Sequence, residues 1–162
     1  VTGVQTCALP ILSINAEAGE RAPQAGAEVP RRPLPARFKG LPVLLADDEP
    51  VNRLIAQTLL EEAGLQVTTV TNGEEAVAAA RDMQFVVILM DLQMPRMDGI
   101  AATAAIRQLP GYAETPILAL TANAFPQDRE RCLAAGMNDF LAKPFGPAEL
   151  VAMMERWVTV PG

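Results

Sequence analysis

The chain has 162 residues, half of them apolar, so it is long enough for one domain with a sizeable hydrophobic core plus additional segments. It contains no histidine, which excludes a phosphohistidine donor, a Ser-His-Asp hydrolase and any metal site with histidine ligands. Residues 41–162 carry eight basic and sixteen acidic groups, against five and three in residues 1–40. Because nucleic-acid phosphates need Lys and Arg patches, we expect no nucleic-acid binding by so acidic a chain.

The first 40 residues lack the pattern of a folded domain. Residues 1–11 resemble the translated read-through of a sequencing-library adapter and are expected to carry no function. Residues 12–40 are rich in Ala, Gly, Glu, Arg and Pro, and we predict a disordered linker because this composition buries too little apolar surface to offset the entropy of ordering. No apolar run is long enough to cross a membrane and no secretion signal is present, so we expect a cytoplasmic location without membrane contact.

Strands and helices are predicted to alternate five times within residues 41–158, and a short tail follows at residues 159–162. The predicted strands lie near residues 43–46, 66–70, 85–90, 116–120 and 139–142. The predicted helices cover residues 50–63, 72–82 and 98–109, a segment ending at residue 135, and a segment beginning at residue 147. Repeated strand–helix units with short connections indicate an α/β fold, in which a parallel sheet is covered by helices on both faces.

Local signals define the ends and faces of two of these helices. Pro50 suits a first helical position and Gly64 suits a helix end, while Asn72 and Glu75 have the spacing of a capping box. One apolar stripe at helical spacing predicts the buried face of the first helix. Its members are Val51, Leu54, Ile55, Leu59 and Ala63.

Polar side chains stand at the carboxyl ends of four predicted strands: Asp47 with Asp48, then Asp91, Thr121 and Lys143. A single Asp in such a place is most often a helix cap, but four strand ends of this kind favour a shared site. Two carboxylates about 4 Å apart repel by about 4 kcal/mol at an effective dielectric constant of 20, so three of them favour a divalent cation. An all-oxygen cluster with few protein ligands suits Mg²⁺.

Together, these residues resemble the receiver domain of response regulators in two-component signalling, most closely the C-terminal receiver of hybrid sensor histidine kinases. The resemblance covers residues 41–158 and implies a flavodoxin-like, doubly wound (βα)5 fold with a five-stranded parallel sheet in the order 2-1-3-4-5. The segments that carry it are Asp47 to Arg53, Asp91 with Met94, Pro95, Met97, Asp98 and Gly99, Leu120 to Ala124, and Gly136 to Pro144.

The resemblance also implies a metal site and a phosphoacceptor. Asp91 would accept a phosphoryl group from the phosphohistidine of a histidine kinase or a histidine phosphotransfer domain. Asp48 and Asp91 would bind Mg²⁺ directly, Asp47 would act through water, and the backbone carbonyl of Gln93 would complete the ligand set. No independent enzyme activity is expected beyond self-phosphorylation and autodephosphorylation, and the chain would be a fragment of a hybrid histidine kinase.

The remaining residues would stabilise and report the phosphoryl group. By the same resemblance, Lys143 would neutralise charge on the transferring group, and Thr121 would bind a phosphoryl oxygen. Thr121 and Phe140 would form the conformational switch, and Phe140 lacks the hydroxyl that a tyrosine would supply. Gln93 and Asn123 would flank the phosphate and tune its lifetime.

Two other classes of function remain open at this point. A degenerate receiver could act only as a docking module, although the complete set of polar residues argues against it. A phosphatase of the haloacid-dehalogenase type also uses an Asp nucleophile with Mg²⁺, Thr and Lys. Those enzymes have a second Asp two residues after the nucleophile, where this chain has Gln93, and the chain has no room for a cap domain.

Overall fold

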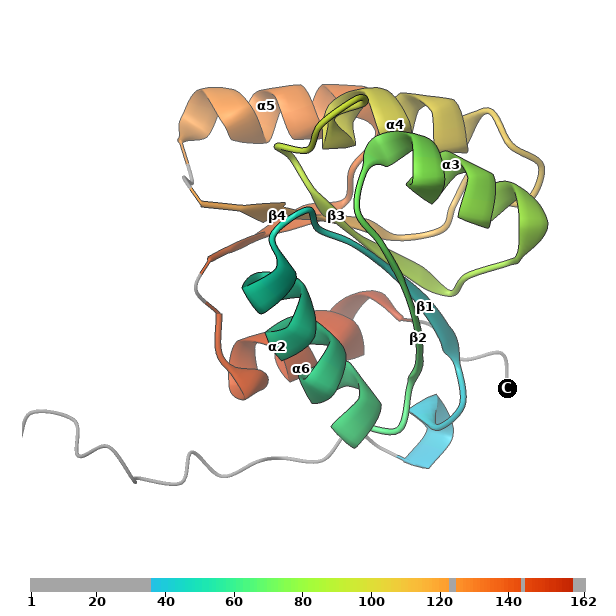
Figure 1. The fold of residues 1–162 in the computed structure, drawn as a ribbon, viewed down its shortest axis with the longest axis vertical. Helices are drawn as coiled ribbons and strands as arrows, with labels where there is room; N and C mark the ends of the chain where they lie inside the picture. The colour runs from blue at the N-terminus through green and yellow to red at the C-terminus, as the bar shows by residue number, and fades with distance from the viewer. Residues whose placement is uncertain (1–35, 123–124, 144, 159–162) are drawn as a thin grey trace, which may run out of the picture. The chain divides into compact units, whose positions relative to one another are not determined.

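The computed structural model describes residues 36–122, 125–143 and 145–158, and Figure 1 shows their arrangement. These residues fall within one compact unit, residues 32–162. Strands and helices alternate as predicted. In chain order they are η1 (Ala36–Phe38), β1 (Pro42–Ala46), α2 (Pro50–Glu62), β2 (Gln66–Val70), α3 (Gly73–Asp82), β3 (Val87–Asp91), α4 (Gly99–Arg107), β4 (Ile117–Thr121), α5 (Pro126–Ala135), β5 (Asp139–Ala142) and α6 (Pro147–Trp157).

The five strands form one parallel sheet in the order β2-β1-β3-β4-β5. Every residue of β3 and β4 is buried, as expected for central strands covered on both faces. The predicted flavodoxin-like fold and its strand order are therefore confirmed.

Helices cover both faces of the sheet. Figure 1 shows α3, α4 and α5 on one face, and α2 and α6 on the other. Because neighbouring strand residues point to opposite faces, Leu44 and Ile88 belong to the core under α3–α5, whereas Leu45 and Leu89 belong to the core under α2 and α6. The short apolar runs of the sequence thus contribute side chains to two hydrophobic cores, one on each face of the sheet.

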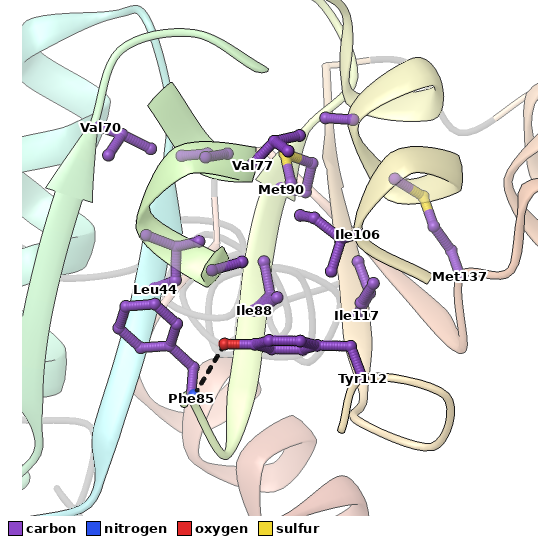
Figure 2. Packing of buried hydrophobic residues seen from close by; sticks show 14 of the residues in the cluster. Leu44, Val70, Val77, Phe85, Ile88, Met90, Ile106, Tyr112, Ile117 and Met137 are labelled. Atoms are coloured by element: carbon purple, nitrogen blue, oxygen red, sulfur yellow. Dashed lines mark hydrogen bonds between the residues drawn. The ribbon is translucent and has the colours of Figure 1, made fainter. Parts of the chain in front are cut away.

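Tyr112 joins the loop after α4 to the segment that precedes β3. The residue is 1% exposed, and its hydroxyl group accepts a hydrogen bond from the Phe85 N–H at 3.2 Å. Figure 2 draws this bond as a dashed line. The same hydroxyl donates to the carbonyl oxygen of Met83. A buried hydroxyl with both bonds made fixes the edge of the core opposite the carboxyl ends of the strands.

The predicted cap of α3 is present in a modified form. The Asn72 side chain accepts a hydrogen bond from the Glu75 N–H at 2.9 Å, as a capping box requires. The Glu75 carboxylate, however, accepts from the Thr71 N–H at 2.8 Å and from the Thr71 hydroxyl, one residue before the cap. Hydrogen bonds from Glu75 to Asn72 and from Thr71 to Glu75 therefore fix the turn before α3.

The predicted buried stripe of α2 is wrong for three of its members. Val51, Leu54 and Ile55 are 62%, 63% and 49% exposed, whereas Ala56 and Leu60 are buried. The remaining two members of the stripe are partly buried against the second core. The helix carries apolar residues on two faces, and only one of those faces can meet the sheet.

The folded region begins earlier than residue 41. Ala36–Phe38 form a short 3-10 helix, and the Phe38 side chain is fully buried in the core shared with α2 and α6. The linker predicted for residues 12–40 therefore does not extend through residues 36–40. The predictions for residues 1–11, 12–35 and 159–162 fall on parts of the chain that the structure does not describe. No helix among the described residues is long and apolar enough to cross a membrane.

Candidate functional site

The site is built where the carboxyl ends of four neighbouring strands meet. Asp47 follows the last residue of β1, Asp91 is the last residue of β3, Thr121 is the last residue of β4, and Lys143 follows the last residue of β5. Because the strands are parallel and adjacent, these ends lie at one edge of the sheet. The polar residues selected from the sequence are thus brought together by the topology.

Three carboxylates converge at this edge. One carboxylate oxygen from each of Asp47, Asp48 and Asp91 lies within 4.8 Å of the others. Asp47 and Asp91 are 1% and 7% exposed, whereas Asp48 is exposed. The Asp47 side chain is oriented by the Glu49 N–H, which donates to its Oδ1 at 2.9 Å. The cluster is a buried acidic pair with a third carboxylate open to solvent.

Lys143 bridges the two buried carboxylates. Its Nζ donates to Oδ2 of Asp47 at 2.8 Å and to Oδ2 of Asp91 at 3.0 Å. Burial alone would lower the pKa of Lys143, but the two carboxylates outweigh it and raise that pKa above its usual value. The Lys143 backbone N–H also donates to the Thr121 carbonyl oxygen at 2.7 Å, which extends the pairing of β4 and β5. The ammonium group is therefore charged and held in place.

Asp91 is held in an unfavourable electrostatic environment. Burial raises its pKa to about 6, and the negative charge of Asp47 acts in the same direction. The hydrogen bonds from Lys143 and from the Gln93 N–H, 3.1 Å from Oδ1, oppose this rise without cancelling it. The positive charge near Asp91 is therefore not enough to make its ionised form as stable as it would be in water.

The donor set fits a hard divalent cation. Three carboxylates and one ammonium group leave two net negative charges when all are ionised, and every available ligand atom is oxygen. Oxygen ligands with room for water are typical of Mg²⁺ sites. A cleft of about 770 Å³ opens over the cluster, and its lining includes Asp48, Gln93, Thr121 and Lys143.

Comparisons with known proteins agree with this geometry. The family model described as the response regulator receiver domain matches residues 43–155. This chain belongs to that family. The match favours the receiver over the phosphatase alternative, as does Gln93, which stands where those phosphatases have a second Asp.

Related proteins extend the comparison. The signal transduction histidine-protein kinase BarA of Escherichia coli (strain K12) is 43% identical over 115 residues, which are 71% of this chain and 12% of that kinase. The receiver domain of the sensor histidine kinase PA1611 from Pseudomonas aeruginosa PAO1, whose crystal structure has a magnesium ion coordinated in the active site cleft, is 46% identical with a TM-score of 0.70. That match covers 74% of this chain and 98% of the other.

A third match is a complex. It is the co-crystal structure of the histidine phosphotransfer protein Ypd1 from Saccharomyces cerevisiae with the receiver domain of its downstream response regulator Ssk1. The matched chain is 30% identical with a TM-score of 0.68, and the match covers 75% of this chain and 90% of that chain. Since the BarA match lies within a histidine kinase, this receiver resembles those of hybrid kinases and spans a small part of such proteins.

The predicted switch residues of the receiver share one cavity. Thr121 and Phe140 both line a narrow space of about 10 Å³ under α5, close to the volume that one water molecule needs. Phe140 is half-buried, and the guanidinium carbon of Arg129 lies 5.1 Å from its ring centroid. Asn123, predicted to tune the phosphate lifetime, lies outside the described residues.

Sequence reasoning missed the contacts that hold the site in shape. Gly99 was predicted to start a helix and belongs to a family segment, but its close contact was not predicted: a Cβ atom there would lie 2.2 Å from the Asp91 carbonyl oxygen. Arg53, which donates to the Asp47 carbonyl oxygen at 2.8 Å, was only one residue of a family segment. The Asp98–Gly99 pair could have signalled a close approach, but nothing in the sequence identifies the partner.

Proposed function

We propose that this receiver accepts a phosphoryl group on Asp91 from a phosphohistidine on a partner protein, with Mg²⁺ bound at the acidic cluster. The observation that carries the proposal is the convergence of Asp47, Asp48 and Asp91 around the Lys143 ammonium group at the open end of the sheet. Three carboxylates placed together repel one another, so their convergence at the mouth of a cleft favours a functional role over a purely structural one.

Asp48 and Asp91 would bind the metal directly, with Asp47 acting through water and the Gln93 carbonyl oxygen completing the protein ligands. When bound, the metal supplies positive charge that offsets the carboxylates and the equatorial phosphoryl oxygens. The raised pKa of Asp91 supports this role for a cation, because burial and the neighbouring Asp47 both disfavour the ionised carboxylate.

In the transfer step, an oxygen of the ionised Asp91 carboxylate attacks phosphorus, and an O–P bond forms as the P–N bond to the donor histidine breaks. The electron pair of the broken bond stays on the imidazole nitrogen, which is protonated after it leaves. Lys143 remains charged and faces the new phosphoryl oxygens from its position between Asp47 and Asp91. It therefore stabilises charge in the transition state.

The aspartyl phosphate would then change the conformation of the switch residues Thr121 and Phe140. Phosphorylation adds about −1.5 to −2 charges and three strong acceptor oxygens. The Thr121 hydroxyl would turn toward one of these oxygens, and the Phe140 ring would move into the space that both residues line. Gln93, and Asn123 by the family pattern, would control how readily water reaches the phosphorus.

The proposed partner is a histidine kinase or a histidine phosphotransfer domain, as in the co-crystallised pair of Ypd1 and Ssk1. We also propose that the chain belongs to a hybrid kinase, because the matched kinase is far longer than the segment it shares with this chain. The free, buried thiol of Cys132 suits a reducing compartment, which supports a cytoplasmic location.

The donor class can be tested with phosphoramidate, a small donor that carries the same P–N bond as phosphohistidine. Incubation with Mg²⁺ is expected to give a singly phosphorylated protein, and an excess of chelator is expected to prevent it. A mixture with a phosphorylated histidine phosphotransfer domain should show loss of label from the histidine and gain on this chain. A receiver that binds Mg²⁺ but takes no phosphoryl group from either donor would indicate a docking module instead.

A further inference from the structure

The loop between β3 and α4, residues 92–98, wraps around the proposed acceptor. Near its start the Gln93 N–H donates to Asp91 Oδ1 at 3.1 Å, so the loop backbone touches the acceptor carboxylate itself. Just beyond its end the Gly99 N–H donates to the Leu92 carbonyl oxygen at 3.1 Å and closes the loop. The position of this loop therefore fixes both the Gln93 carbonyl group and the orientation of Asp91.

A second turn holds this loop from the side. The N–H of Gly73, the first residue of α3, donates to the Met97 carbonyl oxygen at 3.0 Å. Gly73 is buried, and a Cβ atom at this position would lie 2.4 Å from that oxygen and 2.9 Å from the Met97 carbonyl carbon. Contacts below 3.0 Å do not occur for real Cβ atoms, so any side chain at Gly73 would push the Met97 backbone away.

Gly73 is required for space rather than for an unusual backbone angle, since it is absent from the residues with positive φ. Hydrogen bonds hold the turn that carries Gly73, so this turn cannot easily move away from Met97. Asn72 is 4% exposed and caps α3, and Glu75 accepts two hydrogen bonds from Thr71. On the other side, Arg96 has a φ of 66°, a left-handed conformation that is rare for a residue with a side chain. The α3 side of the contact is thus held by hydrogen bonds, and the loop side contains a residue in an unfavourable backbone conformation.

We propose that Gly73 is a positioning residue of the phosphoacceptor site: its bare backbone sets the distance between the turn before α3 and the loop of residues 92–98, and so places the Gln93 carbonyl oxygen for the metal. This inference rests on the proposed Mg²⁺-dependent function. It extends the site to a residue that touches none of the reacting atoms.

The test compares three variants of the full chain. Gly73→Ala should weaken Mg²⁺ binding about tenfold in titration calorimetry, which is the size of effect seen when residues supporting metal ligands are changed. Gly146→Ala is the matched control. Gly146 is the N-cap of α6, whereas Gly73 is the first residue of α3, so both lie at the start of a helix. Gly146 has a φ of −97° and nothing within 4 Å of a new Cβ atom. Phe38→Ala is a destabilised control, since it empties a core position in a different part of the fold.

Both controls should keep the wild-type Mg²⁺ affinity, even though Phe38→Ala lowers the midpoint of urea unfolding. Wild-type affinity in Gly73→Ala, whatever its stability, would overturn the positioning role. Failure of the wild type to bind Mg²⁺ would overturn the proposed function, and the positioning role with it. If Gly73→Ala does not fold, Asn72→Ala serves as a gentler variant that loosens the same turn without adding an atom. Unchanged Mg²⁺ affinity in Asn72→Ala would then reject the proposal.

Discussion

Replacing Asp91 with Asn is expected to stabilise the metal-free receiver near neutral pH. The structure raises the pKa of Asp91 from 3.8 to about 6, chiefly through burial, so its ionised form is disfavoured in the folded state. A rise in pKa from 3.8 to about 6 corresponds to about 3 kcal/mol, because a tenfold change in an equilibrium constant is about 1.4 kcal/mol. Asn removes this cost. The raised pKa already includes the hydrogen bond from Lys143 to the ionised carboxylate, so the expected gain in unfolding free energy is of the same order, about 1–3 kcal/mol.

The pH dependence follows from the direction of that shift. A carboxyl group with a raised pKa in the folded state keeps its proton to a higher pH in the folded protein than in the unfolded chain. The wild type therefore loses stability as pH rises from about 4 to about 6. The advantage of Asp91→Asn should therefore be full above about pH 6 and absent below about pH 4.

Urea unfolding of both proteins with a chelator present, at several pH values, measures this difference. Added Mg²⁺ should stabilise the wild type more than Asp91→Asn, because a ligand that binds only the folded state raises its stability. The difference in unfolding free energy between the two proteins should therefore become smaller or change sign. The reasoning is refuted if metal-free Asp91→Asn is less stable than the wild type at neutral pH. It is also refuted if the advantage does not change with pH.

Three further substitutions test other parts of the account by urea unfolding. Leu54→Ala should change stability by less than about 0.5 kcal/mol because its side chain is 63% exposed, whereas Leu60→Ala should cost about 2–5 kcal/mol; equal losses would contradict the assignment of the two faces of α2. Lys143→Gln should cost about 3 kcal/mol without metal, since two buried carboxylates lose their partner, and Mg²⁺ should recover part of that loss. Tyr112→Phe should cost about 1–3 kcal/mol because the Phe85 N–H loses its acceptor, and a smaller effect would mean that water replaces the hydroxyl.

The sequence was sufficient for the fold because each strand is a short apolar run bounded by strong local signals. The helix boundaries at Pro50 and Pro147 agree with the structure, and so does the cap at Asn72. The parallel topology follows from the alternation of strands and helices. Once it is known, the polar residue at each strand end is placed at one edge of the sheet, as Asp91 and Lys143 show.

What could not be predicted depends on packing between distant segments. Helical periodicity cannot say which of two apolar faces meets the sheet, which is why the exposure of Leu54 was missed. Phe38 lies in a linker-like composition, and its burial depends on a space that only the assembled sheet and helices create. Gly73 approaches Met97 across a gap of 24 positions, and no local pattern identifies the backbone that a glycine will meet.

The central claim is that Asp91 accepts a phosphoryl group in a metal-dependent reaction. The most direct measurement is intact mass after incubation with acetyl phosphate and Mg²⁺, for the wild type, for Asp91→Asn and for the wild type with a chelator. The account predicts one labile phosphoryl group on the wild type and none in the other two samples. An unmodified wild type with confirmed Mg²⁺ binding, or a phosphoryl group that persists in Asp91→Asn, would contradict it.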